Sequence, residues 1–133
     1  MNMKEYFERT PGRGVLSTAD SNGKVDAAIY STPHILTDGT VAFIMRDRLS
    51  HHNIRENPYA SYLFIEDTQR SAGLRLFLKR FKEETDAALI KSLMRRHLTP
   101  EEDQALGQTF LVSFTIEKIL PLIGSDPSKI PVC

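Results

Sequence analysis

The sequence predicts a mainly β fold, a small antiparallel barrel with helices at its margins, formed by a single domain over residues 1–133. Short apolar runs recur along the chain and are separated by tight-turn pairs such as Asn22-Gly23, which is typical of antiparallel hairpins. Only a few stretches between them have helical periodicity. The length of 133 residues and the hydrophobic content of 41% fit one domain with a modest core.

The chain opens with a short helix and a hairpin. Apolar residues within 3–7 recur at helical spacing, and Pro11 and Gly12 end that helix. Strands are then predicted at 15–19 and 25–32, because a turn rich in Asn and Gly separates these two runs.

A third strand is predicted at 41–45, because the turn pair Asp38-Gly39 comes just before it. We expect this strand to pair with the second one, since consecutive strands usually lie side by side. The sheet would then grow as an antiparallel meander.

The basic segment 46–58 leads from the third strand to a fourth at 59–66. Ser50 is expected to cap a short helix that runs to about Ile54, because its hydroxyl can accept a bond from a free helix amide. Pro58 ends the helix, since the residue before a proline avoids helical geometry. Two arginines, a hydroxyl and a helix start at the end of a buried strand suit a phosphate.

The rest of the chain predicts two more strands and two helices. Polar residues 67–72 form an exposed loop, and the alternating residues 74–79 form a fifth strand. Apolar residues at i, i+3, i+4 and i+7 predict an amphipathic helix over 83–98. A capping box at Thr99 starts a further short helix, and the apolar run 110–116 is the sixth strand.

The charge balance and the single cysteine argue against several function classes. Seventeen basic and seventeen acidic residues give a formal net charge of zero, which argues against a nucleic-acid partner or a membrane surface. Any phosphate site must therefore be local. The only cysteine is Cys133, so neither a disulfide framework nor a Cys-rich metal site is expected. The charged amino terminus lacks a long apolar stretch, so we expect a cytoplasmic protein without a secretory signal or membrane span.

Three stretches of the sequence carry a family resemblance. Residues 14–28 form a strand, a turn and a second strand, and residues 38–45 form a turn and a third strand. Residues 53–64 follow the pattern N-L-x-x-N-P-x-x-x-x-x-F, with isoleucine at its second position. These stretches, which residues 75–78 extend, resemble the FMN-binding split barrels related to pyridoxamine 5′-phosphate oxidase. The resemblance implies a six-stranded antiparallel split β-barrel that binds FMN, commonly across the interface of a homodimer.

The resemblance also implies which residues hold FMN. In that family the flavin phosphate is held by the segment before the short helix and by the adjacent second strand. The corresponding positions are Ala28, Ile29, Tyr30 and Ser31 on the strand, and Arg46, Arg48, Leu49 and Ser50 on the segment. Just upstream, backbone groups of Ile44 and Met45 are expected to face the edge of the isoalloxazine ring. Arg75 is added because a charge in mid-strand needs a partner, which a ligand phosphate, a flavin carbonyl or Glu66 would supply.

This chain departs from the family pattern at two positions. Many members carry a lysine where Ser50 stands and an arginine near Ala28, and neither is present here. The cations must therefore come from Arg48 and Arg46, with Arg75 or a partner subunit as a further source. The structural alternative for Arg46 and Arg48 is a solvated loop with weak ion pairs. The region that contacts the substrate phosphate in pyridoxamine 5′-phosphate oxidase is not found, so that reaction itself is not expected.

The function implied by the resemblance is FMN-dependent oxidation or reduction of a small-molecule substrate. The flavin carries out the transfer, so the sequence assigns no catalytic residue. A non-catalytic FMN-binding or electron-carrier protein would need the same phosphate contacts and stays open. A haem-binding barrel with His34, His51 or His52 as axial ligand is a third hypothesis. Hydrolase and P-loop motifs are absent from the sequence.

The aromatic and imidazole side chains have structural alternatives. His51 and His52 are adjacent and point to different faces of a helix, so no shared metal site is expected. We expect both at the surface or facing a partner subunit, and we expect a structural role for His34. His97 falls on the apolar stripe of the predicted helix and is interpreted as a packing residue. Tyr30 either stacks near the flavin or fills the barrel.

Overall fold

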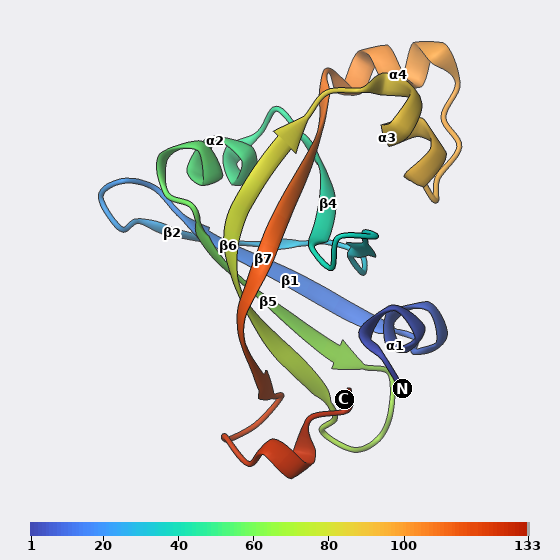
Figure 1. Cartoon of the computed structure of the whole chain (residues 1–133). Helices are drawn as coiled ribbons and strands as arrows, with labels where there is room; N and C mark the ends of the chain where they lie inside the picture. The colour runs from blue at the N-terminus through green and yellow to red at the C-terminus, as the bar shows by residue number, and fades with distance from the viewer. Residues whose placement is uncertain (133) are drawn as a thin grey trace.

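The computed structural model describes residues 1–132, in which seven antiparallel strands form one sheet in the order β2-β1-β5-β6-β7-β4-β3 (Figure 1). The strands are β1 (Gly12–Ala19), β2 (Val25–Ile29), β3 (His34–Ile35), β4 (Val41–Arg46), β5 (Tyr59–Glu66), β6 (Gly73–Glu84) and β7 (Thr109–Pro121). The helices are α1 (Met3–Arg9), α2 (Leu49–Glu56), α3 (Ala87–Leu93) and α4 (Pro100–Leu106), followed by a 3₁₀ turn at Pro127–Lys129. The predicted mainly β fold with flanking helices is confirmed. It has seven strands rather than six, because the short β3 pairs with β4.

The predicted meander is wrong at β4, which does not pair with β2 but lies between β7 and β3. Side chains of Val41, Phe43 and Met45 point into the core, while Ala42 packs with Ile90 of α3. Alternate residues of β2 are exposed, whereas β4 is buried on both faces. A strand of that kind needs cover on both faces, which the core supplies on one face and α3 supplies on the other.

The inward faces of the strands and the predicted opening helix α1 form one aromatic-rich core. Tyr62 and Phe64 on β5 are fully buried, and Phe7 of α1 packs edge to face on Phe64 with ring centroids 5.3 Å apart. Gly14 lies against this core, where a Cβ would come within 1.8 Å of the Tyr62 hydroxyl. That hydroxyl donates to the Tyr30 carbonyl at 3.2 Å, which holds the end of β2 beside the core.

Two helices differ from their predictions. α2 begins at Leu49, and its N-cap residue Arg48 makes no side-chain cap bond, so the prediction that Ser50 caps this helix is wrong. Because the helix starts earlier than predicted, Ser50 lies buried in its first turn. The helix predicted over 83–98 is shortened at both ends to α3, since β6 continues to Glu84 and pairs with β7 there, and the helix ends at Leu93.

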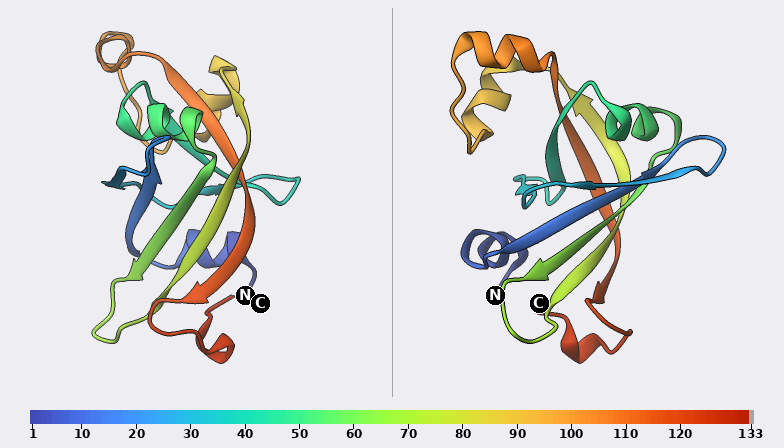
Figure 2. Two further views of the ribbon diagram at one scale, coloured as in Figure 1. Left: turned by 90° about the vertical axis from the view of Figure 1, so that its left-hand side faces the viewer. Right: turned by 180° about the vertical axis from the view of Figure 1, so that it is seen from behind.

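Helices α3 and α4 with their connections, residues 85–108, are named the helical segment. The segment joins β6 to β7 and lies at one end of the sheet, packed on β4 and β7 (Figure 1 and Figure 2). The predicted capping box is confirmed, since Thr99 accepts a bond from the Glu102 amide at 3.1 Å. His97 lies beyond α3 and is exposed, so its predicted packing role is wrong. None of the helices within residues 1–132 has the length and apolar character of a membrane span.

Candidate ligand-binding site

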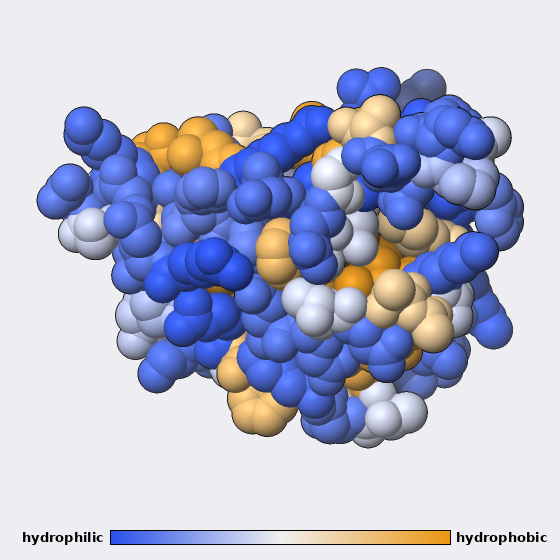
Figure 3. Space-filling model, turned by 90° about the horizontal axis from the view of Figure 1, so that it is seen from above, coloured by the Kyte–Doolittle hydropathy of each residue, from blue (hydrophilic) through white to orange (hydrophobic). Residues whose placement is uncertain are grey.

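A cavity of about 350 Å³ lies between β4, the end of β2 and the helical segment. This volume falls in the range of about 300–1,000 Å³ that small-molecule sites occupy. Its apolar wall is formed by Phe43, Ile44, Met94, Leu98 and Leu106. Its polar lining is formed by Tyr30, Ser31, Thr32, His34, Arg46, Arg48, Arg95 and Arg96. We name it the arginine cavity; Figure 3 views the same end of the molecule, where apolar side chains are exposed between hydrophilic ones.

Several of the predicted positions meet in the arginine cavity: Tyr30, Ser31, Ile44, Arg46 and Arg48. They come from the end of β2, from β4 and from the residue before α2. The Tyr30 ring packs edge to face on Phe43 with centroids 5.8 Å apart, which joins segments that are not hydrogen-bonded to each other. Tyr30 therefore fills space in the barrel and also faces the cavity.

The other predicted positions lie outside this lining. Ile29 and Leu49 are exposed, and Met45 is fully buried in the core because side chains alternate along β4. Ser50 is buried in the first turn of α2, and Ala28 is half-buried on β2. The structure therefore places the cavity beside β4 and beyond the end of β2.

Arg75 is also outside the lining of the arginine cavity. Its guanidinium donates to the backbone carbonyls of Pro121 at 2.9 Å and Gly124 at 2.5 Å. Backbone carbonyls thus serve as the partners of the Arg75 charge. The predicted partners had been a ligand or Glu66. Glu66 accepts instead from the Tyr6 hydroxyl at 2.7 Å.

Sequence reasoning missed the residues that the helical segment contributes. Arg95 donates to the carbonyls of Thr32 at 2.7 Å and Pro33 at 3.5 Å, which holds the segment over the cavity. The adjacent pair Arg95 and Arg96 was a visible charge signal in the sequence. No local pattern, however, indicates a contact between residues 63 positions apart.

The arginine cavity is electropositive, because no carboxylate occurs among the described residues that line it. Arg46 pairs with Asp103 of α4 at 3.0 Å and donates to the Gly107 carbonyl at 2.6 Å. The side chains of Arg48 and Arg96 make no hydrogen bond or ion pair within residues 1–132. Hydrogen bonds from Thr99 lower the pKa of Glu102, and the nearby charge of Arg96 acts in the same direction, so Arg96 already faces a carboxylate. The guanidinium of Arg48 is therefore the more available of the two to an anion.

Two titratable side chains of the lining are neutral at pH 7. Burial lowers the pKa of His34 to about 4, and the nearby charge of Arg95 acts in the same direction. Burial raises the pKa of Tyr30, while a hydrogen bond with Ser50 and the charge of Arg48 act in the opposite direction. His34 and Tyr30 therefore offer hydrogen bonds rather than charge to a ligand. Ser50 reaches the site only through its contact with Tyr30.

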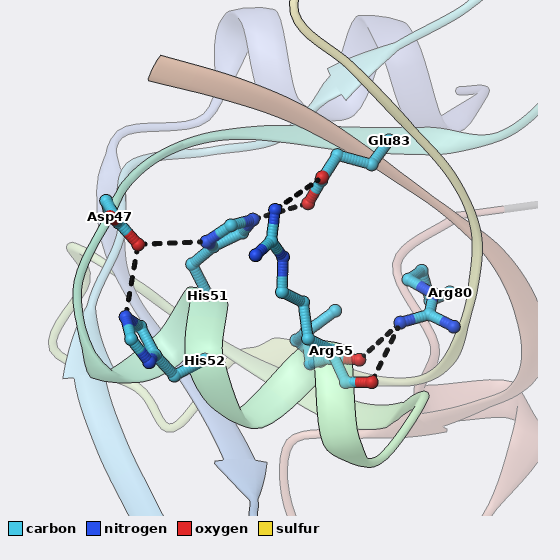
Figure 4. A network of polar contacts seen from close by, with 7 residues as sticks. Asp47, His51, His52, Arg55, Arg80 and Glu83 are labelled. Atoms are coloured by element: carbon cyan, nitrogen blue, oxygen red, sulfur yellow. Dashed lines mark hydrogen bonds and ion pairs between the residues drawn. The ribbon is translucent and has the colours of Figure 1, made fainter. Parts of the chain in front are cut away.

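His51 is buried in α2, which corrects the prediction that it lies at the surface (Figure 4). Its ring stacks on Phe110 with centroids 3.8 Å apart, and its Nε2 bonds to Glu83 of β6. Its Nδ1 lies 3.5 Å from Asp47, which is also 3.1 Å from Nε2 of the exposed His52. This network ties α2 to β6. Within residues 1–132, no group of three or more His, Cys, Asp or Glu side chains is placed to hold a metal ion.

The lining of the arginine cavity fits a ligand that has a flat apolar ring and an anionic tail. Phe43, Ile44 and Leu106 can cover a ring, and unpaired guanidinium groups can form charge-assisted bonds with a phosphate dianion. The hydroxyls of Ser31 and Thr32 and the neutral imidazole of His34 can meet polar ring edges. FMN has all three of these chemical features, so the residues present fit it.

Comparison with known proteins found similarity in structure but not in sequence. No protein-family model matches the chain, and no curated protein matches it. An FMN-binding protein from Syntrophomonas wolfei gives a TM-score of 0.69 at 19% identity, over 91% of this chain and 84% of that chain. A pyridoxamine 5′-phosphate oxidase-like protein from Lactobacillus delbrueckii gives 0.62 at 15% identity, over 87% and 88% of the two chains. An F420 reductase gives 0.61 at 17% identity, over 90% and 97%. At these identities the likeness is one of fold.

Proposed function

We propose that this chain, which has the split-barrel fold of FMN-binding and pyridoxamine 5′-phosphate oxidase-like proteins, binds FMN in the arginine cavity and uses it to oxidise or reduce a small molecule. The observation that carries the proposal is the pair Arg48 and Arg96. Within residues 1–132 neither guanidinium group forms a hydrogen bond or ion pair, although Arg96 also lies near the carboxylate of Glu102, and both groups lie beside an apolar wall. Such forks match the geometry of a phosphate.

Each part of the lining has a separate role in this proposal. Bound FMN supplies the hydride or electron transfer. Arg48 and Arg96 hold the phosphate, while Phe43 and the other apolar side chains keep water from the ring. Neutral His34 and the Tyr30 phenol exchange hydrogen bonds with the polar edge of the ring or with the substrate.

We also propose that the protein acts as a homodimer. The register of β2, β1 and β5 places Ile29, Val15 and Leu63 in one row on the outward face of the sheet. On β2, Val25 and Ile29 are 83% and 76% exposed. Adjoining apolar side chains of this kind are typical of interaction surfaces. A partner subunit on this face would bury them and could supply a further cation to the phosphate.

The absorption spectrum of the purified protein, before and after FMN is added, tests the cofactor. We expect flavin bands that remain with the protein through gel filtration. A colourless protein that takes up no FMN would overturn the proposal. A Soret band that is lost in His34→Ala would indicate haem instead, because His34 lines the arginine cavity whereas His51 is buried against Glu83.

Turnover separates an enzyme from an electron carrier. The FMN-loaded protein, mixed with NADH or NADPH and an electron acceptor, should oxidise the nicotinamide over many cycles. Tightly held FMN without turnover, across a panel of acceptors, would indicate the carrier function.

A further inference from the structure

A second cavity, of about 290 Å³, lies within the helical segment between α3 and α4. Its walls include the apolar side chains of Ile90, Met94 and Leu98 and the nitrogen-bearing side chains of Lys91, Arg96 and His97. A cavity of about 150 Å³ accepts a benzene ring, so this one has room for a ring and a polar substituent. We name it the helical cavity.

The helical cavity is rich in unpaired nitrogen groups. Within residues 1–132, the side chains of Lys91, Arg96 and His97 form no hydrogen bond or ion pair. Among its described lining residues the single carboxylate is Asp103, which already pairs with Arg46 at 3.0 Å. Arg96 also lies near the carboxylate of Glu102, whereas Lys91 and His97 are open to an anion. A dianionic phosphate would satisfy both of these side chains better than a carboxylate.

The two cavities share a wall. Met94, Arg96 and Leu98 line both of them. A molecule in the helical cavity would therefore lie next to a molecule in the arginine cavity, and the guanidinium of Arg96 could contact either one. Because of this shared wall, a ligand in the helical cavity would lie beside the proposed FMN site.

We propose that the helical cavity binds a small organic phosphate with an apolar body. Ile90, Met94 and Leu98 contact the apolar body of the ligand. Lys91 and His97 donate hydrogen bonds to its phosphate. In the proposed oxidoreductase this subsite holds the anionic end of the substrate. That role rests on the proposed function, whereas the binding site itself does not.

Phenyl phosphate is a suitable probe, titrated into the full-length ¹⁵N-labelled protein saturated with FMN so that the arginine cavity is filled. We expect saturable amide shifts at Ile90, Met94 and Thr109, which line the helical cavity. Phenol, which lacks the phosphate, and benzoate, which carries a single charge, should both bind more weakly. The absence of saturable shifts, or shifts confined to Tyr30 and Ile44 of the arginine cavity, would overturn the proposal.

Lys91→Ala is the informative variant, because Lys91 lines the helical cavity and not the arginine cavity. Alanine favours a helix, and Lys91 is exposed on α3, so the fold should be retained. We expect phenyl phosphate to bind about tenfold more weakly, with much of the affinity restored in Lys91→Arg. Lys24→Ala, in the turn between β1 and β2, is the matched control and should bind normally. Unchanged affinity in Lys91→Ala would contradict the site.

The proposed phosphate site and the proposed function can be disproved independently of each other. Lys91→Ala should leave FMN uptake unchanged, and Arg48→Ala should leave phenyl phosphate binding at Ile90 and Thr109 unchanged. If the protein takes up no FMN, phenyl phosphate titrated into FMN-free Arg48→Ala protein still tests the helical cavity by the same amide shifts.

Discussion

Arg48 is the residue on which the phosphate assignment depends most directly. It is the N-cap residue of α2, and its side chain faces the arginine cavity without a partner within residues 1–132. We expect Arg48→Ala to weaken FMN binding by about tenfold to a hundredfold, the usual range for a hydrogen bond to a charged group. Riboflavin lacks the phosphate and should lose much less. Flavin fluorescence titrations measure both affinities.

Arg70→Ala is the matched control for this prediction. Arg70 lies in the exposed loop between β5 and β6 and does not line the arginine cavity. This variant should bind both flavins normally. Equal losses of FMN and riboflavin in Arg48→Ala would count against a phosphate contact.

The lowered pKa of His34 leads us to expect that the folded protein becomes less stable at acidic pH. Burial, helped by Arg95, holds its pKa in the folded protein at about 4, against an ordinary value of 6.5. Between these values the unfolded chain binds the proton and the folded chain does not. The free energy of unfolding should therefore fall as the pH falls from about 6.5 to 4.

Urea unfolding over this pH range measures the effect of His34. The decline should be shallower in His34→Gln than in the wild type, because glutamine does not titrate. Parallel pH profiles for the two proteins would show that His34 contributes nothing to the decline.

At the scale of elements, α2 is held on the sheet by bonds to β6. His51 is fully buried and bonds to Glu83, while Arg80 donates to the Ile54 carbonyl at 2.6 Å near the other end of the helix (Figure 4). These contacts fix the start of α2, where Arg48 faces the arginine cavity. The helix is thus positioned by tertiary contacts rather than by its own caps, since its N-cap makes no side-chain bond.

Glu83→Ala should weaken this attachment. The change leaves the buried Nε2 of His51 without its partner, so we expect the free energy of unfolding to fall by about 2 kcal/mol. Urea denaturation measures the loss. Glu84→Ala is the neighbouring control and should cost less, because Glu84 pairs with the exposed Lys82. Equal losses in the two variants would contradict a special role for the His51 contact.

At the scale of the whole molecule, the exposed apolar row on the sheet predicts self-association. Ile29→Glu places a charge in that row and should give a folded monomer, because β2 keeps its backbone pairing with β1. Light scattering coupled to gel filtration measures the molar mass. Ile123→Glu, another exposed apolar position that lies after β7, should leave a dimer intact. A wild-type protein that is monomeric at high concentration would refute the dimer.

The features of the fold that could be predicted are those that depend on residues close together in the sequence. The apolar run over 59–66 became β5 with the predicted bounds, and the capping box at Thr99 formed as expected. The predicted helix over 83–98 was too long at both ends, since pairing with β7 extended β6 to Glu84 and α3 ended at Leu93. At residues 83 and 84 strand pairing overrode the helical periodicity.

The sequence by itself determined most of the local helices and strands, and it indicated the part of the arginine cavity that β4 and the segment before α2 form. Arg46 and Arg48 follow the apolar run 41–45 and could be named from the sequence pattern, whereas Tyr30, Ser31 and Ile44 were implied by the family resemblance.

Only the tertiary structure decided the order of the strands and the part of the arginine cavity that the helical segment forms. β4 lies between β7 and β3, and contacts with the core and with α3 bury its two faces. Arg95 and Arg96 reach the cavity because the helical segment packs on β4 and bonds to the chain after β2. Burial and long-range hydrogen bonds between distant segments set these contacts, and neither leaves a periodic signal in the sequence.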